Sequence, residues 1–271
     1  MFTIPADITT LASRIEGANA QNLAETSEVA ARLFPDSGAT AQPVAGGVAA
    51  FVGADIPLSY AVGLGLNGPV TDDDIAQVVE FYRARGAVPR VDVCPLADGS
   101  LLVALRKHGF KLHWFVNVLG RGIMSGDDFT PLPDEIYVRE ALAPEVEQWA
   151  AVVDAGFSDG APLTEARRRL GLMIFQRPAT RTYFALINGI VVGAGALFAD
   201  RNYAGLAATA VLPDYRGRGV HTALIRKRLA DARKLGCDLA GFFAEPGSVS
   251  QRNAERHGFR PLYTKAVMKA E

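Results

Sequence analysis

The apolar positions along the chain follow two different periods, which predicts a mixture of helices and strands. Apolar residues spaced three or four apart indicate helices at 19–33, 72–85, 101–108, 144–155, 165–175, 220–235 and 249–257. Short apolar runs between breaker residues indicate strands at 42–52, 60–66, 91–94, 112–119, 136–139, 182–187, 190–197, 206–211, 239–243 and 262–268. This interleaving of short helices and strands predicts an α/β (α+β) fold.

Local signals fix several of these boundaries. Asn188–Gly189 lies between two apolar runs and predicts a tight β-hairpin, because both residue types accept left-handed backbone angles. Gly46–Gly47 predicts a turn or bulge inside the strand region 42–52. Thr71 directly precedes a helical pattern and is predicted to cap the N-terminus of that helix.

A four-residue motif recurs at a spacing of about half the chain. KHGF occupies Lys107–Phe110 and RHGF occupies Arg256–Phe259, so the two glycines lie 258 − 109 = 149 residues apart. The same shift relates Val62 to Val211 and keeps the order of the flanking elements. A glycine that ends a helix, followed by a buried phenylalanine, explains the motif without a catalytic histidine. We interpret the pattern as an internal duplication.

The segment 126–134 contains three acidic residues and two prolines and is predicted to be the linker between the two copies. The predicted domains are therefore 1–125 and 135–271.

Composition excludes several classes of protein. A net charge of −1 over 271 residues gives no basic surface for nucleic acid. Cys94 and Cys237 are the chain's two cysteines, and the Cys and His residues show no metal-ligand spacing, so we expect neither a metal site nor a disulfide framework. Neither a signal-peptide pattern nor an apolar run of membrane-spanning length is visible, so we expect a cytoplasmic protein without a membrane partner.

The most informative stretch, AVLPDYRGRGVHTALIRKRL, runs from Ala210 to Leu229. A predicted strand ends near Val211, and Arg216-Gly217-Arg218-Gly219 then opens a predicted helix. Free amides at a helix N-terminus, together with the helix dipole, favour phosphate. The two arginines add positive charge, and Thr222 adds a hydroxyl. Thr222 stands where a dinucleotide fingerprint needs its third glycine, and a P-loop G-K-[ST] is absent.

This stretch resembles the pyrophosphate loop of the GCN5-related N-acetyltransferases (GNAT family), which follows V-x-P and reads [QR]-x-x-G-x-[GA]. Val211-Leu212-Pro213, Arg216 and Gly219 match that pattern, whereas His221 replaces its final small residue. The order of predicted elements over 135–271 is also similar to this family. The resemblance implies two tandem GNAT-like domains, each with a twisted, mixed and mostly antiparallel sheet flanked by helices.

The resemblance also implies the ligand and its contacts. Acetyl-CoA would lie between the strand before the loop and the strand after the following helix. Its pantetheine arm would pair with 206–211. The implied coenzyme-binding residues are Val211, Arg216, Gly217, Arg218, Gly219, Val220, His221 and Thr222.

The catalytic residues are less well marked. In the family a tyrosine often stands four residues before the glycine of the GF motif and protonates the leaving thiolate, but this chain has Ala254 there. Glu245 ends the strand that would open the gap and is the best-placed carboxylate for a general base. The same residue type at that place also caps helices or faces solvent, and both alternatives stay open.

Where the second copy reads DYRGRGVH, the first reads LGLNGPVTDDD: the arginines are absent, and Asp72, Asp73 and Asp74 lie in the first turn of the predicted helix. Three carboxylates in the first turn of a helix repel phosphate. We therefore expect 1–125 to be a degenerate copy without coenzyme.

The resulting hypothesis is an N-acetyltransferase that moves an acetyl or other acyl group from acetyl-CoA to an amine of a small molecule or peptide. The alternative is a non-catalytic acyl-CoA-binding or regulatory module. The acceptor, the preferred acyl chain and the oligomeric state are left open.

Overall fold

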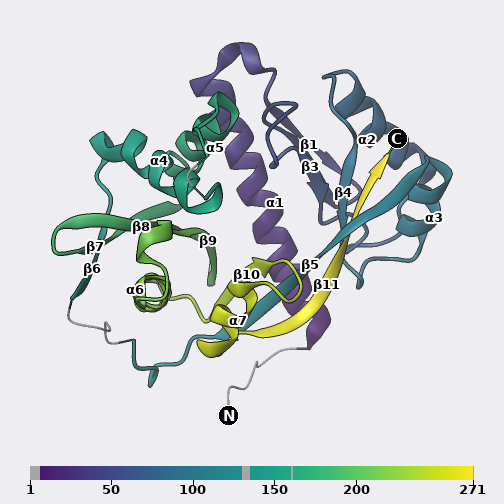
Figure 1. Cartoon of the computed structure of the whole chain (residues 1–271). Helices are drawn as coiled ribbons and strands as arrows, with labels where there is room; N and C mark the ends of the chain where they lie inside the picture. Colours follow the sequence, from purple (N-terminus) through teal and green to yellow (C-terminus); the bar gives the residue numbers. More distant parts are fainter. Residues whose placement is uncertain (1–6, 130–134, 160, 271) are drawn as a thin grey trace. The chain divides into compact units, whose positions relative to one another are not determined.

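The computed structural model describes residues 7–129, 135–159 and 161–270 (Figure 1). The described residues divide into two compact units. The N-terminal unit holds 7–118 together with 244–246 and 261–270, and the C-terminal unit holds the described residues of 119–243 and 247–260. The chain therefore passes between the units several times, and no single cut in the sequence separates them.

The N-terminal unit is a sheet covered by helices on both faces. Its helices are α1 (Ile8–Leu33), α2 (Asp72–Arg83) and α3 (Ser100–Lys107), and its strands are β1 (Thr40–Val44), β2 (Gly47–Phe51), β3 (Tyr60–Val62), β4 (Arg90–Val93), most of β5 (Phe110–Gly122) and β11 (Arg260–Ala270). The strand order is β1-β2-β3-β4-β11-β5. β3 and β4 run parallel, whereas β1/β2, β2/β3 and β4/β11 are antiparallel.

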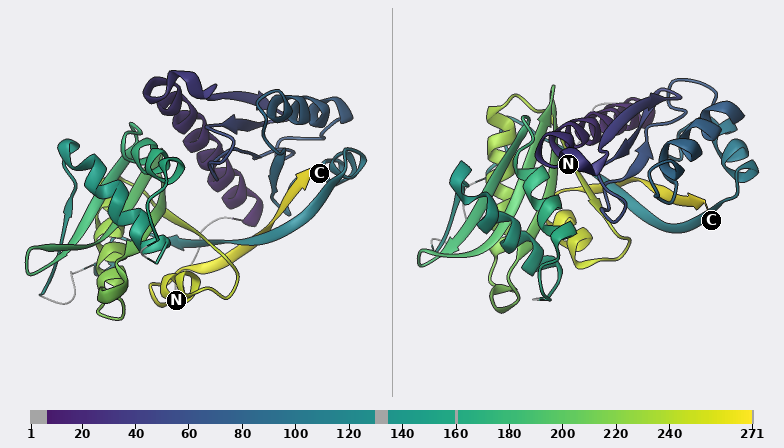
Figure 2. Two further views of the ribbon diagram at one scale, coloured as in Figure 1. Left: turned by 45° about the horizontal axis from the view of Figure 1, so that its top comes forward. Right: turned by 90° about the horizontal axis from the view of Figure 1, so that it is seen from above.

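Alternation along the strands places the two apolar layers of this unit. Tyr60 and Val62 pack with Leu23 of α1 on one face of the sheet. Ala61, between them, packs with Ile75 of α2 on the other face. Successive strand residues point to opposite faces, so even this three-residue strand contributes to both layers. The long helix α1 lies along β1–β3 in both views of Figure 2.

The C-terminal unit is a second helix-covered sheet. Its strands are β6 (Ile136–Glu140), β7 (Thr180–Ile187), β8 (Ile190–Asp200), β9 (Tyr203–Val211) and β10 (Leu239–Ala244), and its helices are α4 (Val146–Phe157), α5 (Glu165–Phe175), α6 (Val220–Lys234) and α7 (Val249–Arg256). The order is β10-β9-β8-β7-β6, antiparallel except for the parallel pair β9/β10. The end of β5 lies beside β10.

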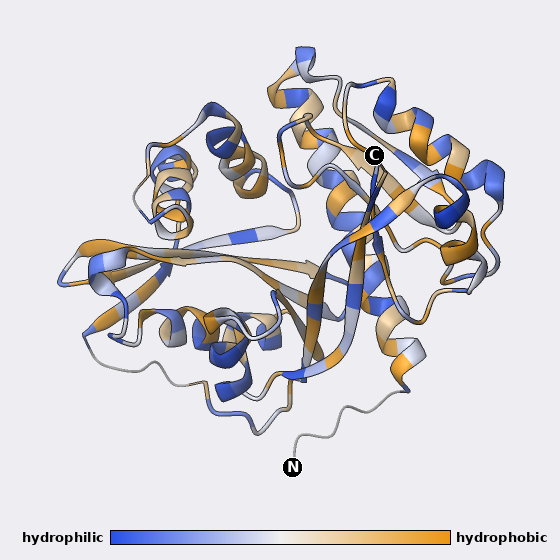
Figure 3. Ribbon diagram, turned by 45° about the vertical axis from the view of Figure 1, so that its right-hand side comes forward, coloured by the Kyte–Doolittle hydropathy of each residue, from blue (hydrophilic) through white to orange (hydrophobic). Residues whose placement is uncertain are grey.

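Trp149 of α4 fixes one layer of this unit. Its ring packs with Phe184, Ala194 and Ala196, and its Nε1 donates to the Tyr183 carbonyl. The Tyr183 hydroxyl donates to Asp231 of α6, on the opposite face of the sheet. The helices alternate between hydrophilic and hydrophobic residues along their length, as amphipathic helices on a sheet do (Figure 3). Each unit is thus a mixed, mostly antiparallel sheet flanked by helices, as expected.

The local signals are confirmed with small changes. Asn188 and Gly189 both have positive φ and join β7 to β8. Thr71 caps α2 and forms a capping box with Asp74. The first turn is made by Ala45 and Gly46, and Gly47 already belongs to β2.

Helix α1 begins at Ile8, eleven residues before the predicted start. Asp7 caps this end by accepting hydrogen bonds from the Thr9 and Thr10 amides. The apolar stripe continues through Leu11 and Ile15, so the prediction was too short.

The 149-residue shift relates most of the observed elements. Adding 149 to α3 (100–107) gives 249–256, which are the bounds of α7. Adding 149 to β4 (90–93) gives 239–242, which lies inside β10. Adding 149 to β5 (110–122) gives 259–271, which includes all of β11. These matches support an internal duplication.

The division into domains 1–125 and 135–271 stays a prediction about the repeats. The compact units differ from it, because β11 lies between β4 and β5 in the N-terminal unit. Part of the predicted linker, 130–134, lies outside the described residues.

A buried ion pair ties β11 into the N-terminal unit. Lys265 donates to Glu16 of α1 at 3.1 Å, and the Tyr263 hydroxyl donates to the same carboxylate at 2.8 Å. Glu16 is 0% and Lys265 1% exposed. Burial alone would lower the pKa of Lys265, but the carboxylates of Glu16 and Asp92 raise that pKa above its usual value. Lys265 therefore stays charged, and each member of the pair depends on the other.

We expect Lys265→Met to lower the free energy of unfolding by roughly 3–5 kcal/mol, because the Glu16 carboxylate stays buried without its cation. The double variant Glu16→Gln/Lys265→Met should recover most of that loss. Urea unfolding followed by circular dichroism measures both. Lys234→Met removes a lysine whose side chain is 76% exposed and should change stability by less than about 0.5 kcal/mol. A single variant as stable as the parent, or a double variant no better than the single, would contradict this account.

Candidate functional site

The parallel strands β9 and β10 separate partway along their length. Tyr203–Leu206 pairs with Leu239–Phe242, whereas β9 continues to Val211 beyond the last paired residue. A bulge marks the separation: Ala208 has a φ of 49°, and the β8/β9 register shifts between Ala194 and Ala196. The last residues of β9 therefore present an open edge toward the space where β10 diverges.

Directly after this edge the chain forms a loop that opens helix α6. Pro213–Tyr215 makes one 3-10 turn, and Gly217 and Gly219 follow with φ of 76° and 87°. Residues with side chains rarely adopt these angles, so both glycines are needed for the loop conformation. Gly219 is the N-cap of α6 and supplies no side-chain cap. The first amides of a 15-residue helix thus point outward at its positive end.

The open edge and the loop border one pocket of about 540 Å³. β9 and the loop contribute Thr209, Ala210, Val211, Tyr215, Arg216, Gly217 and Gly219; α6 contributes Val220, His221 and Thr222; α4 contributes Gly156 and Phe157; and α7 contributes Val249, Ser250, Asn253 and Arg256. Seven of the eight residues predicted to bind the coenzyme therefore line it together. Their binding role remains a prediction.

Two predicted residues do not line the pocket. Arg218 places its guanidinium 5.2 Å from the centre of the Tyr215 ring. Glu245 is exposed and follows the last residue of β10. Its proposed role as general base stays a prediction.

Arg216 has a structural task that the sequence did not suggest. Its guanidinium donates to the Gly156 carbonyl at the end of α4 and to the Val211 carbonyl, and it pairs with Asp159. Gly156 itself allows α4 to approach β9, since a Cβ there would lie 2.6 Å from the Ala210 Cβ. Arg216 therefore holds the pocket wall and is partly neutralised by Asp159.

His221 lines the pocket as an uncharged side chain. Both ring nitrogens are buried and have no hydrogen-bond partner among the described residues. Burial, together with the positive charge of Arg228, lowers the pKa of His221 to about 3. The imidazole therefore supplies no positive charge for phosphate at neutral pH.

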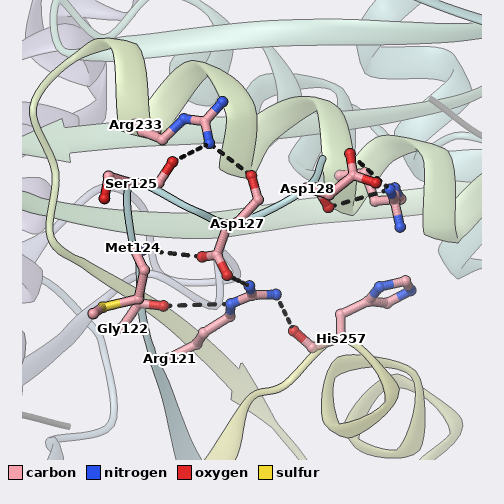
Figure 4. A network of polar contacts seen from close by, with 9 residues as sticks. Arg121, Gly122, Met124, Ser125, Asp127, Asp128, Arg233 and His257 are labelled. Atoms are coloured by element: carbon pink, nitrogen blue, oxygen red, sulfur yellow. Dashed lines mark hydrogen bonds and ion pairs between the residues drawn. The ribbon is translucent and has the colours of Figure 1, made fainter. Parts of the chain in front are cut away.

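Thr222 is held by the end of α7. Its Oγ1 lies 3.1 Å from Nε2 of His257. Burial lowers the pKa of His257, so this ring favours its neutral form. The His257 carbonyl accepts a hydrogen bond from Arg121, and Arg121 pairs with Asp127 at 2.8 Å (Figure 4).

The same network holds the segment after β5 against α6. Arg233 of α6 donates to the Asp127 carbonyl at 2.7 Å and to the Ser125 carbonyl at 3.3 Å (Figure 4). Asp127 also accepts from the Met124 amide. His257 thus belongs to the scaffold of the pocket, although the sequence suggested only a last-turn residue.

Sequence reasoning missed the lining residues of α4 and α7, whereas Thr209 lies within 206–211, the segment predicted to pair with the pantetheine arm. Ser250, Asn253 and Arg256 recur every three residues and so share one helix face, a spacing that identifies them once α7 is placed beside the loop. Ala254 is fully buried. Phe157 carries no comparable pattern.

The described residues contain no helix both long and apolar enough to cross a membrane. They also contain no cluster of three His, Cys, Asp or Glu side chains able to hold a metal ion.

Comparisons with known proteins give matches in sequence and in fold. Residues 146–259 match the sequence model of the Acetyltransferase (GNAT) family. A GCN5-related N-acetyltransferase from Kribbella flavida has a similar structure, with a TM-score of 0.68 and 18% identity over 96% of this chain and 95% of that chain. A second GCN5-related N-acetyltransferase, from Sphaerobacter thermophilus, has a TM-score of 0.59 and 17% identity over 78% of this chain and 71% of that chain.

A tandem GNAT protein from the clavulanic acid biosynthesis pathway gives a TM-score of 0.57 and 16% identity, over 83% of this chain and 78% of that chain. No curated protein matches the chain. Residues 146–259 thus match the GNAT acetyltransferase family in sequence, and the chain as a whole shares its fold with GNAT proteins. The sequence match supports acyl transfer as the general class of reaction.

We expect Gly219→Val to weaken acetyl-CoA binding by roughly tenfold or more, because a β-branched residue at positive φ costs about 1–2 kcal/mol and displaces the loop. Gly236 is the matched control: it has a φ of 80° at the other end of α6 and does not line the pocket. Gly236→Val should impose similar strain with little loss of affinity. Arg216→Ala should cost less than Gly219→Val, since the Arg216 side chain is 47% exposed and already paired. Equal affinities for Gly219→Val and the parent in calorimetry would rule out the loop as the binding element.

His221 gives a prediction about acid stability. Its pKa is near 3 in the folded protein but near 6.5 when unfolded, so the unfolded chain binds the extra proton as pH falls below about 6.5. The contribution of neutral His221 is therefore fully present above that pH and is lost toward pH 3. In His221→Gln, the decrease in the free energy of unfolding between pH 7 and pH 5 should be smaller than in the parent. An identical decrease in urea titrations would show that His221 takes up its proton in the folded state.

Proposed function

We propose that the chain is an N-acetyltransferase that transfers an acetyl group from acetyl-CoA to an amine of a small molecule or peptide. The observation that carries this proposal is the pocket of the C-terminal unit. There Gly217 and Gly219, both in the left-handed backbone conformation, precede α6 beside the unpaired edge of β9. The GNAT match over 146–259 supports the reaction class.

The pocket suits the two ends of such a coenzyme. The outward amides at the start of α6 suit the pyrophosphate, because they combine hydrogen-bond donors with the positive end of a helix dipole. The unpaired end of β9 offers backbone groups in extended conformation, which suit the two amides of the pantetheine arm. The acyl group would then lie near the bulge at Ala208.

The chemistry requires a neutral amine that attacks the thioester carbonyl. The C–N bond forms, the C–S bond breaks, and the electron pair of the broken bond stays on sulfur. Glu245 remains our candidate for the base that takes the proton of the amine.

The equivalent loop of the N-terminal half supports a single coenzyme site. Thr71 and Asp74 satisfy each other's backbone amides in the capping box at the start of α2. Asp72 pairs with Lys107 at 2.7 Å across the hollow beside this helix. Carboxylates thus occupy the place that phosphate takes in our proposal for the C-terminal unit, and we propose that the N-terminal half is a copy that has lost the coenzyme.

Calorimetric titration with acetyl-CoA should show one site per chain, and Gly68→Val in the N-terminal half should leave the affinity unchanged. Incubation with acetyl-CoA and a panel of amines should release free CoA, detected by its thiol. Binding without CoA release from any amine would favour the alternative, a non-catalytic acyl-CoA-binding module. Two equivalent sites would contradict the degenerate N-terminal copy.

A further inference from the structure

Arg228 is a fully buried cation without a carboxylate partner in the described part of the chain. It lies in α6, its exposed fraction is 0%, and its guanidinium donates only to uncharged oxygens. The nearest acid along the helix, Asp231, pairs instead with Lys227 and Lys234 and accepts from Tyr183. Burial lowers the pKa of Arg228 to about 9, so the side chain is still positive at neutral pH.

The structure around Arg228 is built to hold this charge at the bulge. Nε donates to the Leu224 carbonyl at 2.9 Å, and Nη1 donates to the carbonyls of Ala196 and Ala207 at 3.0 and 3.1 Å. A Cβ at Gly195 would lie 3.1 Å from Nη1 and 3.2 Å from Cζ, so the glycine provides the room. A buried unpaired charge costs several kcal/mol, and this arrangement offsets only part of that cost.

The fourth hydrogen bond of Arg228 leads into the pocket. Nη2 donates to Oγ1 of Thr209 at 2.8 Å. A guanidinium has no acceptor, so the threonine oxygen accepts, and its own proton must point elsewhere. Thr209 lines the pocket, and among the described residues no acceptor for that proton is found. A hydroxyl that accepts from a cation is also a stronger donor.

We propose that Thr209, oriented and polarised by Arg228, donates a hydrogen bond to the sulfur of coenzyme A as the thiolate leaves the acyl group. The inference rests on the proposed function, which places the acyl end of the coenzyme at the bulge, one residue before Thr209. In the step the electron pair of the C–S bond stays on sulfur, and the proton of the amine goes to its base. Thr209 keeps its proton, and the thiolate later takes a proton from water.

This arrangement answers the question raised by Ala254. A side chain that protonates the thiolate is needed only if the thiolate is a poor leaving group in its site. A hydrogen bond backed by a buried positive charge lowers the energy of the thiolate where it forms. Arg228 does not contact the coenzyme in this scheme and is a positioning residue.

The test uses free CoA, so that it does not depend on turnover. The thiol of CoA bound to the parent should titrate at a lower pH than the thiol of free CoA in the same buffer, as followed by thiolate absorbance in the ultraviolet. Thr209→Val removes the donor at nearly constant shape and should raise the pKa of the bound thiol by about one to two units. Thr209→Ser keeps the hydroxyl and should behave like the parent.

Arg228→Met removes the charge and should raise the same pKa. Arg228→Met also leaves buried carbonyls without donors. If this variant does not fold, the comparison of Thr209→Val with Thr209→Ser decides the outcome. With an active amine, Thr209→Val should lower kcat by roughly ten- to a hundredfold while the dissociation constant of acetyl-CoA changes less than about threefold.

The outcomes separate this inference from the proposed function. If the parent binds neither CoA nor acetyl-CoA, both are overturned. If the parent binds CoA and Thr209→Val leaves the pKa of the bound thiol unchanged, the inference fails and the proposed function stands. If the pKa rises in Thr209→Val but no amine is acetylated, the hydrogen bond from Thr209 to the sulfur stands, whereas its role in acyl transfer and the proposed activity are both overturned.

Discussion

The separation of β9 from β10 after Leu206 is the constraint on which the site depends. Had the two strands paired along their whole length, the last residues of β9 would have given their backbone groups to a neighbour. The open edge of β9 coincides with the bulge at Ala208. It also borders the pocket and the exposed N-terminus of α6. In the N-terminal unit, β3 and β4 pair at Ala61 and Val62, which the 149-residue shift relates to residues 210 and 211. In the N-terminal unit, to which we assign no coenzyme, the parallel strands thus stay paired to the last residue of β3, whereas β9 and β10 separate before β9 ends.

Much of this architecture is visible in the sequence because its signals are local. The bounds predicted for α5 coincide with the observed helix, and Asn188–Gly189, Thr71 and the glycine loop act where they were predicted. Each depends on a few neighbouring residues whose backbone preferences are strong. The pairing of β11 with β4 has no such signal, since it joins segments about 170 residues apart and rests on apolar runs that fit many sheet positions.

The charged residues show most clearly where the sequence misleads. Arg226, Lys227 and Arg228 are three consecutive basic residues in α6, and Arg228 is the most buried of the three. Its environment is made by Gly195 and by carbonyls of two strands, and neither has a mark in the sequence before the fold is known. Arg216, which the sequence predicts as a phosphate ligand, also donates to the Gly156 carbonyl at the end of α4, a contact without a mark in the sequence.

The place of β11 has a consequence for the order in which the protein is made. A ribosome releases the chain from its N-terminus, so α1 through β4 emerge long before β11 is synthesised. Until then the N-terminal unit has an open sheet edge at β4 and a buried carboxylate, Glu16, without its lysine. The C-terminal unit, by contrast, takes its strands from β5 onward and has all of them before β11 appears. The half of the protein synthesised first is therefore the half completed last.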